Sequence, residues 1–341
     1  MARSWHFDRP VVEEVGGVGE PVRAVHVVLL GGRVDVVAHA GRSSVRLDVQ
    51  DVIGRPLGVS LGDGTLRVEQ HKEPGSPFLD MVKGFFANGA SSARLTLTVP
   101  AGVKVTITTV SGDVLVGGVE GDVTVSTVSG AVSLSRLAGR VDVRTVSSAV
   151  DAAGLSGELK TKSVSGRLTV DGSTLRSAKL ATVSGPLVLD LVGPVGLVTA
   201  NAVSGDITIH IPGGAGYDVT AASQSGHVVV DGHTLSGGAD ADKGGHRFEG
   251  DRTFAIKART VSGNVVVLRG ESAGVPRVES DALPHLVGRA DDVQDARRPS
   301  GGSALWPGAE GPGASGGPAG PGSGASGSGS DTGSVERGEG I

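Results

Sequence analysis

The sequence predicts an all-β protein whose main part is a single-stranded parallel β-helix, or β-solenoid, with about 18–21 residues per coil. Two observations support this fold class. A short Ser-Gly motif returns at an almost constant spacing, and apolar residues keep fixed positions within each period. The composition agrees, because the 341 residues include 57 glycines and only 3% aromatic residues. Valine dominates the apolar set, and β-branched side chains favour strands over helices.

The recurring motif is Thr/Ser-Val-Ser-Gly or a close variant of it, first seen at residues 109–112. Seven of its serines follow one another at intervals of 18, 18, 18, 19, 20 and 21 residues: Ser111, Ser129, Ser147, Ser165, Ser184, Ser204 and Ser225. The motif returns once more with Ser262, and its glycines are Gly112, Gly130, Gly166, Gly185, Gly205, Gly226 and Gly263. We interpret these residues as structural corners, where glycine allows backbone angles that other residues avoid.

Apolar residues recur at six offsets within the period, which predicts six stacked columns of side chains facing a core. One coil contributes Val114, Val116, Val119, Val123, Val125 and Val128, and the next contributes Val132, Leu134, Leu137, Val141, Val143 and Val146. Alternation by two within each run indicates short strands, and glycines at steps of about nine residues indicate the corners between them. Coils of equal length can lie directly on one another, with each backbone pairing to its neighbours.

Charged residues share the period. Asp122, Arg140 and Glu158 occupy one offset, while Asp142 and Lys160 occupy another. We therefore expect opposite charges to lie one above the other, as markers of register more than as a source of stability.

The repeat covers residues 93–270 and has a different neighbour on each side. Residues 1–92 contain strand-like runs without the regular period, which predicts an irregular β-strand cap; the runs are 23–30, 32–38, 44–50 and 65–69. Residues 271–341 are rich in Gly, Ser, Pro and Ala, which predicts a disordered tail. The repeat loosens after Ser225, and we expect a long loop around residues 240–246.

A short amphipathic segment at 77–88 lies between the cap and the repeat. Its apolar residues have helical spacing: Phe78, Met81, Val82, Phe85 and Phe86. Two interpretations stay open, a plug over the first coil and a segment that binds a partner or a membrane surface.

Composition excludes several classes of protein. The absence of cysteine excludes disulfides and thiolate metal sites. The tail carries ten acidic and five basic residues, which accounts for the net charge of −5 and leaves a neutral body. A neutral body without a lysine or arginine cluster argues against nucleic acid as a partner. No signal peptide or transmembrane stretch is visible, so we expect a cytoplasmic protein whose association with the cell envelope stays open.

Catalytic and metal-binding patterns are not found. Stacking the repeat disperses the carboxylates, whereas glycoside hydrolysis needs two of them close together. No histidine recurs beside the corner serines to act as a base. His227, His233 and His246 share one neighbourhood, but we interpret them as polar loop residues. We therefore expect no catalytic residues, no cofactor and no metal.

The stretch Leu97-Thr98-Val99-Pro100-Ala101-Gly102-Val103, followed by strand residues and recurrent Val-Ser-Gly-Asp-Val corners, resembles the bacterial putative-adhesin family of β-strand-repeat proteins. The resemblance spans about residues 94–270. It implies a β-solenoid domain of unknown function, with some members linked to cell-envelope stress, and it brings no catalytic residues.

Three functions remain in order of preference. The first is a non-enzymatic scaffold for protein–protein interaction or self-association, motivated by the uniform repeat and by a last coil near Leu268 that we expect to be uncovered. The second is a carbohydrate- or envelope-binding module that uses rows of Thr and Ser, although the scarcity of aromatic residues argues against it. The third is a polysaccharide-active enzyme, which would need a cluster of carboxylates or histidines.

Overall fold

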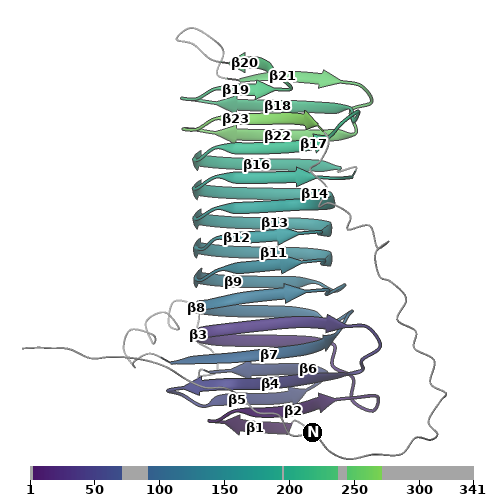
Figure 1. The fold of residues 1–341 in the computed structure, drawn as a ribbon, viewed down its shortest axis with the longest axis vertical. Coiled ribbons are helices and arrows are strands. Elements are labelled where there is room, and N and C mark those ends of the chain that lie inside the picture. Colours follow the sequence, from purple (N-terminus) through teal and green to yellow (C-terminus); the bar gives the residue numbers. More distant parts are fainter. Residues whose placement is uncertain (1–2, 71–90, 194–195, 237–243, 271–341) are drawn as a thin grey trace, which may run out of the picture. The chain divides into compact units, whose positions relative to one another are not determined.

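The strands stack in two facing sheets, which we name sheet A and sheet B, and the chain passes from one to the other in each coil (Figure 1). The computed structural model describes residues 3–70, 91–193, 196–236 and 244–270, all within the compact unit Met1–Glu279. The predicted tail at 271–341 and the amphipathic segment at 77–88 lie outside the described residues. The all-β solenoid predicted from the sequence is confirmed.

Sheet A is built from strands that pair side by side along the stack. From the amino-terminal end its strands are β1 (Arg3–Phe7), β5 (Leu57–Gly62), β6 (Thr65–Glu69), the first half of β3 (Ala24–His39), the first half of β8 (Lys104–Gly117), β9 (Val123–Ser129), β11 (Ala138–Ser147), β13 (Ser156–Ser165), the second half of β14 (Leu168–Ser184), β16 (Leu197–Ser204), β22 (Phe254–Thr260), β18 (Tyr217–Ser223) and β21 (Gly244–Glu249).

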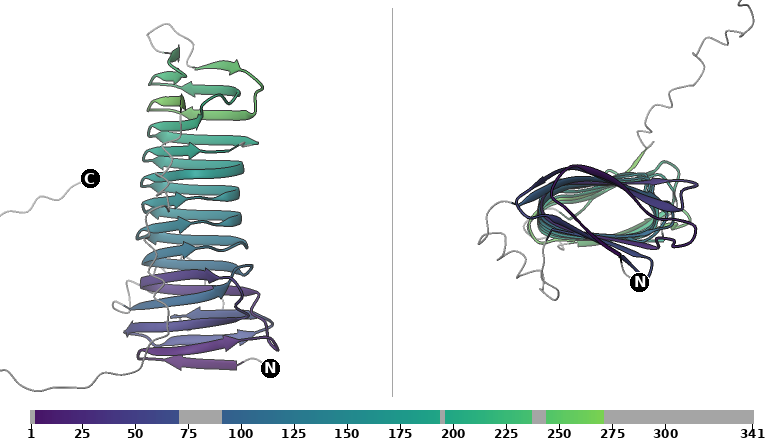
Figure 2. Two further views of the ribbon diagram at one scale, coloured as in Figure 1. Left: turned by 45° about the vertical axis from the view of Figure 1, so that its right-hand side comes forward. Right: turned by 90° about the horizontal axis from the view of Figure 1, so that it is seen from below.

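Sheet B follows the same levels. Its strands are β2 (Val11–Gly16), β4 (Ser44–Ile53), β7 (Ser92–Pro100), the second halves of β3 and β8, β10 (Val132–Ser135), β12 (Val150–Ala153), the first half of β14, β15 (Leu187–Leu191), β17 (Ile207–Pro212), β23 (Val265–Gly270), β19 (Val228–Val230) and β20 (His233–Ser236). Viewed along the stack, the strands of each sheet superimpose and tight corners join the two sheets (Figure 2).

The core lies between the sheets and is mostly aliphatic. Five of the six predicted columns face it: Val123, for example, pairs in register with Val141 and then Leu159, and all three are at most 2% exposed. The sixth column is wrong, because Val146 is 39% exposed. Side chains alternate along a strand, and with Val125 and Thr127 pointing inward the next residue must point outward.

The amino-terminal end departs from a simple winding. β3 pairs with β8 on one side and with β6 and β7 on the other, although β6 and β7 come later in the chain. After β3 the chain therefore moves towards the end of the stack to form β4 and β5. It then returns to form β6 and β7 in the level next to β3. β4 and β5 run antiparallel to β7 and β6, and β2 and β1 complete the end. The predicted strand runs coincide with parts of β3, β4 and β6, except that the first run begins one residue before β3.

At the carboxyl-terminal end, too, the order of strands in space differs from their order in the chain. β22 lies between β16 and β18, and β23 lies between β17 and β19. Antiparallel strands β21 and β20 pair with β18 and β19 beyond them. The expectation of an uncovered last coil near Leu268 is therefore wrong, because that coil is internal. Of the loop expected around 240–246, residues 244–246 belong to β21 instead, and 240–243 lie outside the described residues.

A partly buried polar network around Tyr217 connects the strands at this end. The fully buried Tyr217 accepts a hydrogen bond from Nε of Arg247 at 3.1 Å and donates one to Oε2 of Glu249 at 3.3 Å. Arg269 forms ion pairs with Asp231 at 2.6 Å and with Glu249 at 2.9 Å. The arginine lowers the pKa of Glu249, chiefly through the side-chain hydrogen bond. Strands β18, β21 and β23 are thus tied together by charge-assisted bonds.

The predicted stacking of charges is also seen. Nε of Arg140 lies 3.2 Å from Oε2 of Glu158, and Nζ of Lys160 lies 3.9 Å from Oδ2 of Asp142. In the part of the chain that the structure describes, no helix has the length and apolar character needed to span a membrane.

Candidate interaction surface

The Thr-Val-Ser-Gly corners form one edge of the stack, where the chain turns from sheet A to sheet B. Their serines pair in a single file in the order Ser111, Ser129, Ser147, Ser165, Ser184, Ser204 and Ser262. Ser225 comes last in space, and its backbone N–H donates to the carbonyl of Val261. The last two positions are exchanged relative to the sequence because the final coil is inserted between its neighbours.

The first residue of the motif points inward and bonds to the corner itself. Oγ1 of Thr127 donates to the carbonyl of Ser129 at 2.8 Å, and the hydroxyls of Ser163 and Thr182 make the same bond two residues ahead at 3.3 Å. At these three levels the hydroxyl gives the corner carbonyl a further hydrogen-bond partner. The position does not always carry a hydroxyl, because Ala202 occupies it on one level.

The glycine of the motif is required by the distance between coils. A Cβ atom placed on Gly185 would lie 2.2 Å from the carbonyl oxygen of Gly166, and Gly185 has φ = +129°. The same overlap recurs at Gly205, where the Cβ atom would lie 2.2 Å from the carbonyl oxygen of Gly185. Gly166 and Gly263 also have positive φ, at +132° and +151°. The corner residues therefore have a structural reason to be what they are.

The valine of the motif is the outward residue, and on five successive levels it forms a row that we name the valine ridge. Its members are Val146, Val164, Val183, Val203 and Val261, which are 39%, 48%, 48%, 49% and 45% exposed. Levels in a sheet are about 4.8 Å apart, so the ridge is about 20 Å long. Exposed serines run beside it. The row is straight because the register of the corners does not shift.

The same column is buried towards the amino-terminal end. Val128 is half-buried, Val110 is 5% exposed and Leu30 is 2% exposed. Leu30 and Val110 form a small cluster with Val28 and Val128, separate from the main core. The apolar column thus changes from covered to exposed between Val128 and Val146. Phe78, Met81, Val82, Phe85 and Phe86, the predicted interaction segment, lie outside the described residues.

A family model described as Toastrack DUF4097 matches residues 50–268, more than half of the chain. This chain belongs to the Toastrack DUF4097 family. The matched part runs from β4 into β23 and includes the corners and the whole valine ridge. The family expected from the sequence agrees with this match at the level of a β-repeat domain.

Two solved structures are similar to the Toastrack chain. One is a putative cell adhesion protein from Clostridium sporogenes, with 8% identity, 76% of this chain and 100% of that chain covered, and a TM-score of 0.23. The other is a putative lipid binding protein from Parabacteroides distasonis, with 10% identity, 76% and 97% covered, and a TM-score of 0.33. No curated protein matches the chain significantly.

Two carboxylates of the Toastrack domain meet on sheet B, whereas the repeat predicts dispersed carboxylates. Asp171 and Asp190 follow residues that pair between β14 and β15, and Asp190 pairs in turn with His210 of β17. Burial raises the pKa of Asp190, and the hydrogen bond to Asp171 raises it further. Oδ1 of Asp190 is buried and finds no hydrogen-bond partner among the described residues. Asp171 and Asp190 occupy equivalent positions on adjacent coils, so the sequence predicts this pair when the 19-residue spacing between Ser165 and Ser184 is taken into account.

The three histidines singled out in the sequence make separate local contacts. Nε2 of His246 lies 2.7 Å from Oδ1 of Asp218, and Nδ1 of His233 lies 2.8 Å from the carbonyl of Asp231. His227 uses its backbone N–H to bond Oδ1 of Asn264. Within the described ranges, no group of three or more His, Asp or Glu side chains could hold a metal ion.

Proposed function

We propose that this Toastrack protein is a non-enzymatic scaffold that binds another protein chain through the valine ridge, with a second copy of itself as the first partner to test. The single observation behind the proposal is the unbroken row of five half-exposed valines along one edge of a rigid stack. Isolated exposed valines are ordinary on protein surfaces, but a contiguous apolar row is a feature of interaction sites.

The geometry of the ridge supports a protein partner more than a small ligand. The valines stand on a convex corner, whereas small-molecule sites are concave. The corners that carry the valines are held by inter-coil hydrogen bonds, such as Gly166 N–H to the carbonyl of Ser184 and Gly185 N–H to the carbonyl of Ser204, each 3.2 Å long. A preorganised surface loses little conformational entropy on binding, so even a narrow row can contribute affinity.

The proposal is tested by removing the apolar row without changing charge. In the full chain, the triple variant Val164→Ser, Val183→Ser, Val203→Ser should lower self-association, measured by sedimentation velocity over a range of concentrations. A matched triple, Val12→Ser, Val37→Ser, Val192→Ser, removes the same number of methyl groups from valines that are 42–50% exposed elsewhere. This control should associate like the parent.

Circular dichroism and thermal denaturation would first establish that both triples fold. A parent chain that is monomeric at every concentration, and that crosslinks to no protein in a ridge-dependent manner, would overturn the proposal. Equal association of the two triples would also overturn it.

A further inference from the structure

A second surface on sheet A gathers cations that are scattered in the sequence. We name it the basic strip: the outward residues at two adjacent positions of β11, β13, β14, β16 and β22. They are Asp142 and Arg144, Lys160 and Lys162, Lys179 and Ala181, Thr199 and Asn201, and Lys257 and Arg259. The strip holds six cations and one carboxylate. The strip is not visible as a basic cluster in the sequence, because its residues come from five coils.

Most of these cations have no counter-ion. Asp142 lies 3.2 Å from Nε of Arg144 and 3.9 Å from Nζ of Lys160. Among the described residues, no carboxylate forms a salt bridge with the four remaining cations, Lys162, Lys179, Lys257 and Arg259. All six cations are exposed.

The register places like charges directly opposite one another. Arg144 pairs with Lys162, and Lys160 pairs with Lys179. Like charges at directly opposed positions destabilise a sheet. The strip therefore lowers the stability of the fold in the absence of an anion, and an anionic ligand would relieve the repulsion.

The opposite face of the same coils has the opposite sign. At the matching outward positions of β12, β14, β15, β17 and β23 lie three carboxylates, Asp151, Asp171 and Asp190, and no lysine or arginine. The two faces are separated by the mostly aliphatic core. Such a separation of charge orients the molecule in front of an extended anionic surface, with sheet A towards it.

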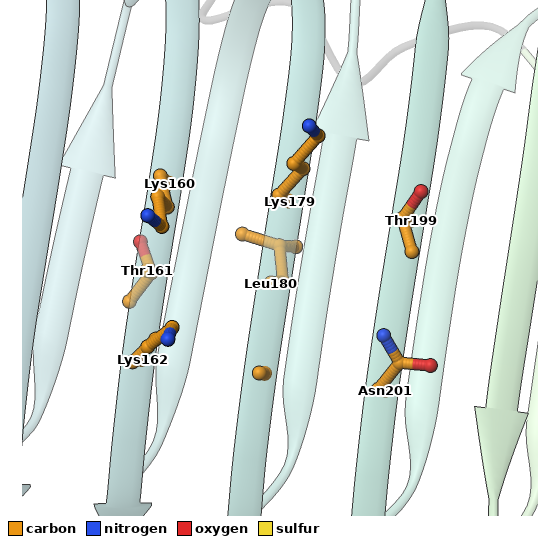
Figure 3. Close-up of a pocket in the computed structure, with 8 residues that line it drawn as sticks. Lys160, Thr161, Lys162, Lys179, Leu180, Thr199 and Asn201 are labelled. Atoms are coloured by element: carbon orange, nitrogen blue, oxygen red, sulfur yellow. The ribbon is translucent and has the colours of Figure 1, made fainter.

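The centre of the strip is hollowed (Figure 3). Ala181 lies between Lys162 and Asn201 in the register, and its small side chain leaves a shallow, open depression. Lys160 and Lys162 of β13 stand on one side of the depression, Thr199 and Asn201 of β16 stand on the other, and Lys179 stands on the central strand β14 with Ala181. The floor of the hollow is mostly apolar, and the ammonium, hydroxyl and amide donors stand at its rim, where they suit a phosphate oxygen presented from outside.

We propose that the basic strip binds the phosphate groups of anionic lipids at a membrane surface. The strip extends over about 20 Å, because its five strands are about 4.8 Å apart, so it spans several headgroups on a flat sheet. An open depression of this kind does not enclose a free ion. The ten positions contain no aromatic residue or leucine to anchor a protein, and none to stack on the bases of a nucleic acid.

The test uses the full chain and vesicles of phosphatidylcholine with or without phosphatidylglycerol, with binding measured by co-sedimentation. Binding should require phosphatidylglycerol and should weaken as salt is raised. The double variant Lys162→Gln, Lys179→Gln should bind roughly 10- to 30-fold more weakly, because each cation near an anionic surface contributes about a factor of five. The control Lys104→Gln, Arg167→Gln removes the same charge from exposed positions off the strip and should bind like the parent.

Loss of folding is separated from loss of binding by thermal denaturation, in which the strip variant should be at least as stable as the parent because like-charge repulsion is removed. Binding that is equal in the two double variants would overturn the proposal, as would its absence from anionic vesicles at low salt. Strip-dependent binding of inorganic phosphate or duplex DNA without vesicle binding would also overturn it. Salt-sensitive self-association without vesicle binding would instead assign the strip to the acidic face of a second copy, and would equally refute the lipid site.

Discussion

Replacing Gly185 with alanine tests whether the corners set the distance between coils. The new Cβ atom would lie 2.2 Å from the carbonyl oxygen of Gly166 and 3.2 Å from its backbone nitrogen. Two non-bonded atoms of this kind rest at about 3.5 Å, so one coil must move by about 1 Å. The backbone also has φ = +129°, which a side chain rarely adopts.

The expected loss of stability can be built from these two effects. The positive φ costs about 1–2 kcal/mol. Relieving the overlap stretches the bonds from Gly166 N–H to Ser184 and from Gly185 N–H to Ser204, and each is worth about 1 kcal/mol. Gly185→Ala should therefore lower the free energy of unfolding by about 3–4 kcal/mol.

Two further glycines separate the contributions. Gly172 has φ = +52° with nothing within 4 Å of its Cβ position, so Gly172→Ala should cost about 1–2 kcal/mol. Gly102 has neither feature, and Gly102→Ala should change stability by less than about 0.5 kcal/mol. Urea denaturation followed by far-ultraviolet circular dichroism measures all three. If Gly185→Ala costs no more than Gly172→Ala, the steric reasoning is refuted.

Two more predictions concern buried polar groups. Thr161 is fully buried in a column with Ile107, Val125, Val143 and Leu180, and its hydroxyl finds no partner among the described residues. Thr161→Val should therefore raise the free energy of unfolding by about 1–2 kcal/mol, as measured by urea denaturation. A loss of stability would contradict this prediction. Burial and Asp171 raise the pKa of Asp190, so the fold favours its protonated form and loses stability as pH rises from the ordinary carboxyl range through the raised pKa. Asp190→Asn should therefore raise the free energy of unfolding at neutral pH and raise it less in acid. Asp151→Asn, on the same face, should give no such pH-dependent stabilisation. An equal stabilisation by Asp190→Asn at both pH values would count against the explanation.

The repeat allows much of the fold to be predicted, because one period defines the register of all the coils that follow it. The inward columns through Val114 and Val123 and the pairing of Arg140 with Glu158 all follow from counting. Val146 was predicted to face the core because valine is apolar, but the alternation of side chains along the strand determines which way it points. Thr145 is inward, so its neighbour is exposed however apolar it is.

The two ends could not be predicted in this way. β3 and β22 each join a neighbour that is distant in the chain, and local periodicity contains no information about such pairing. The candidate surfaces were missed for a related reason. The cations of the basic strip are separated by up to 115 positions in the sequence, from Arg144 to Arg259, and only the stacking brings them together.

The interleaved ends restrict how a protein of this kind can change in length. A coil could not be added directly after β23, because β23 is already paired on both sides, with β17 and β19. A coil could not be added directly before β3 for the same reason, because β3 is paired with β8 and β7. Growth or shortening by whole turns is therefore confined to the uniform stretch between β8 and β15, where removal of one period rejoins equivalent residues. The number of regular coils in this solenoid can therefore vary, whereas the strand order at its two ends cannot.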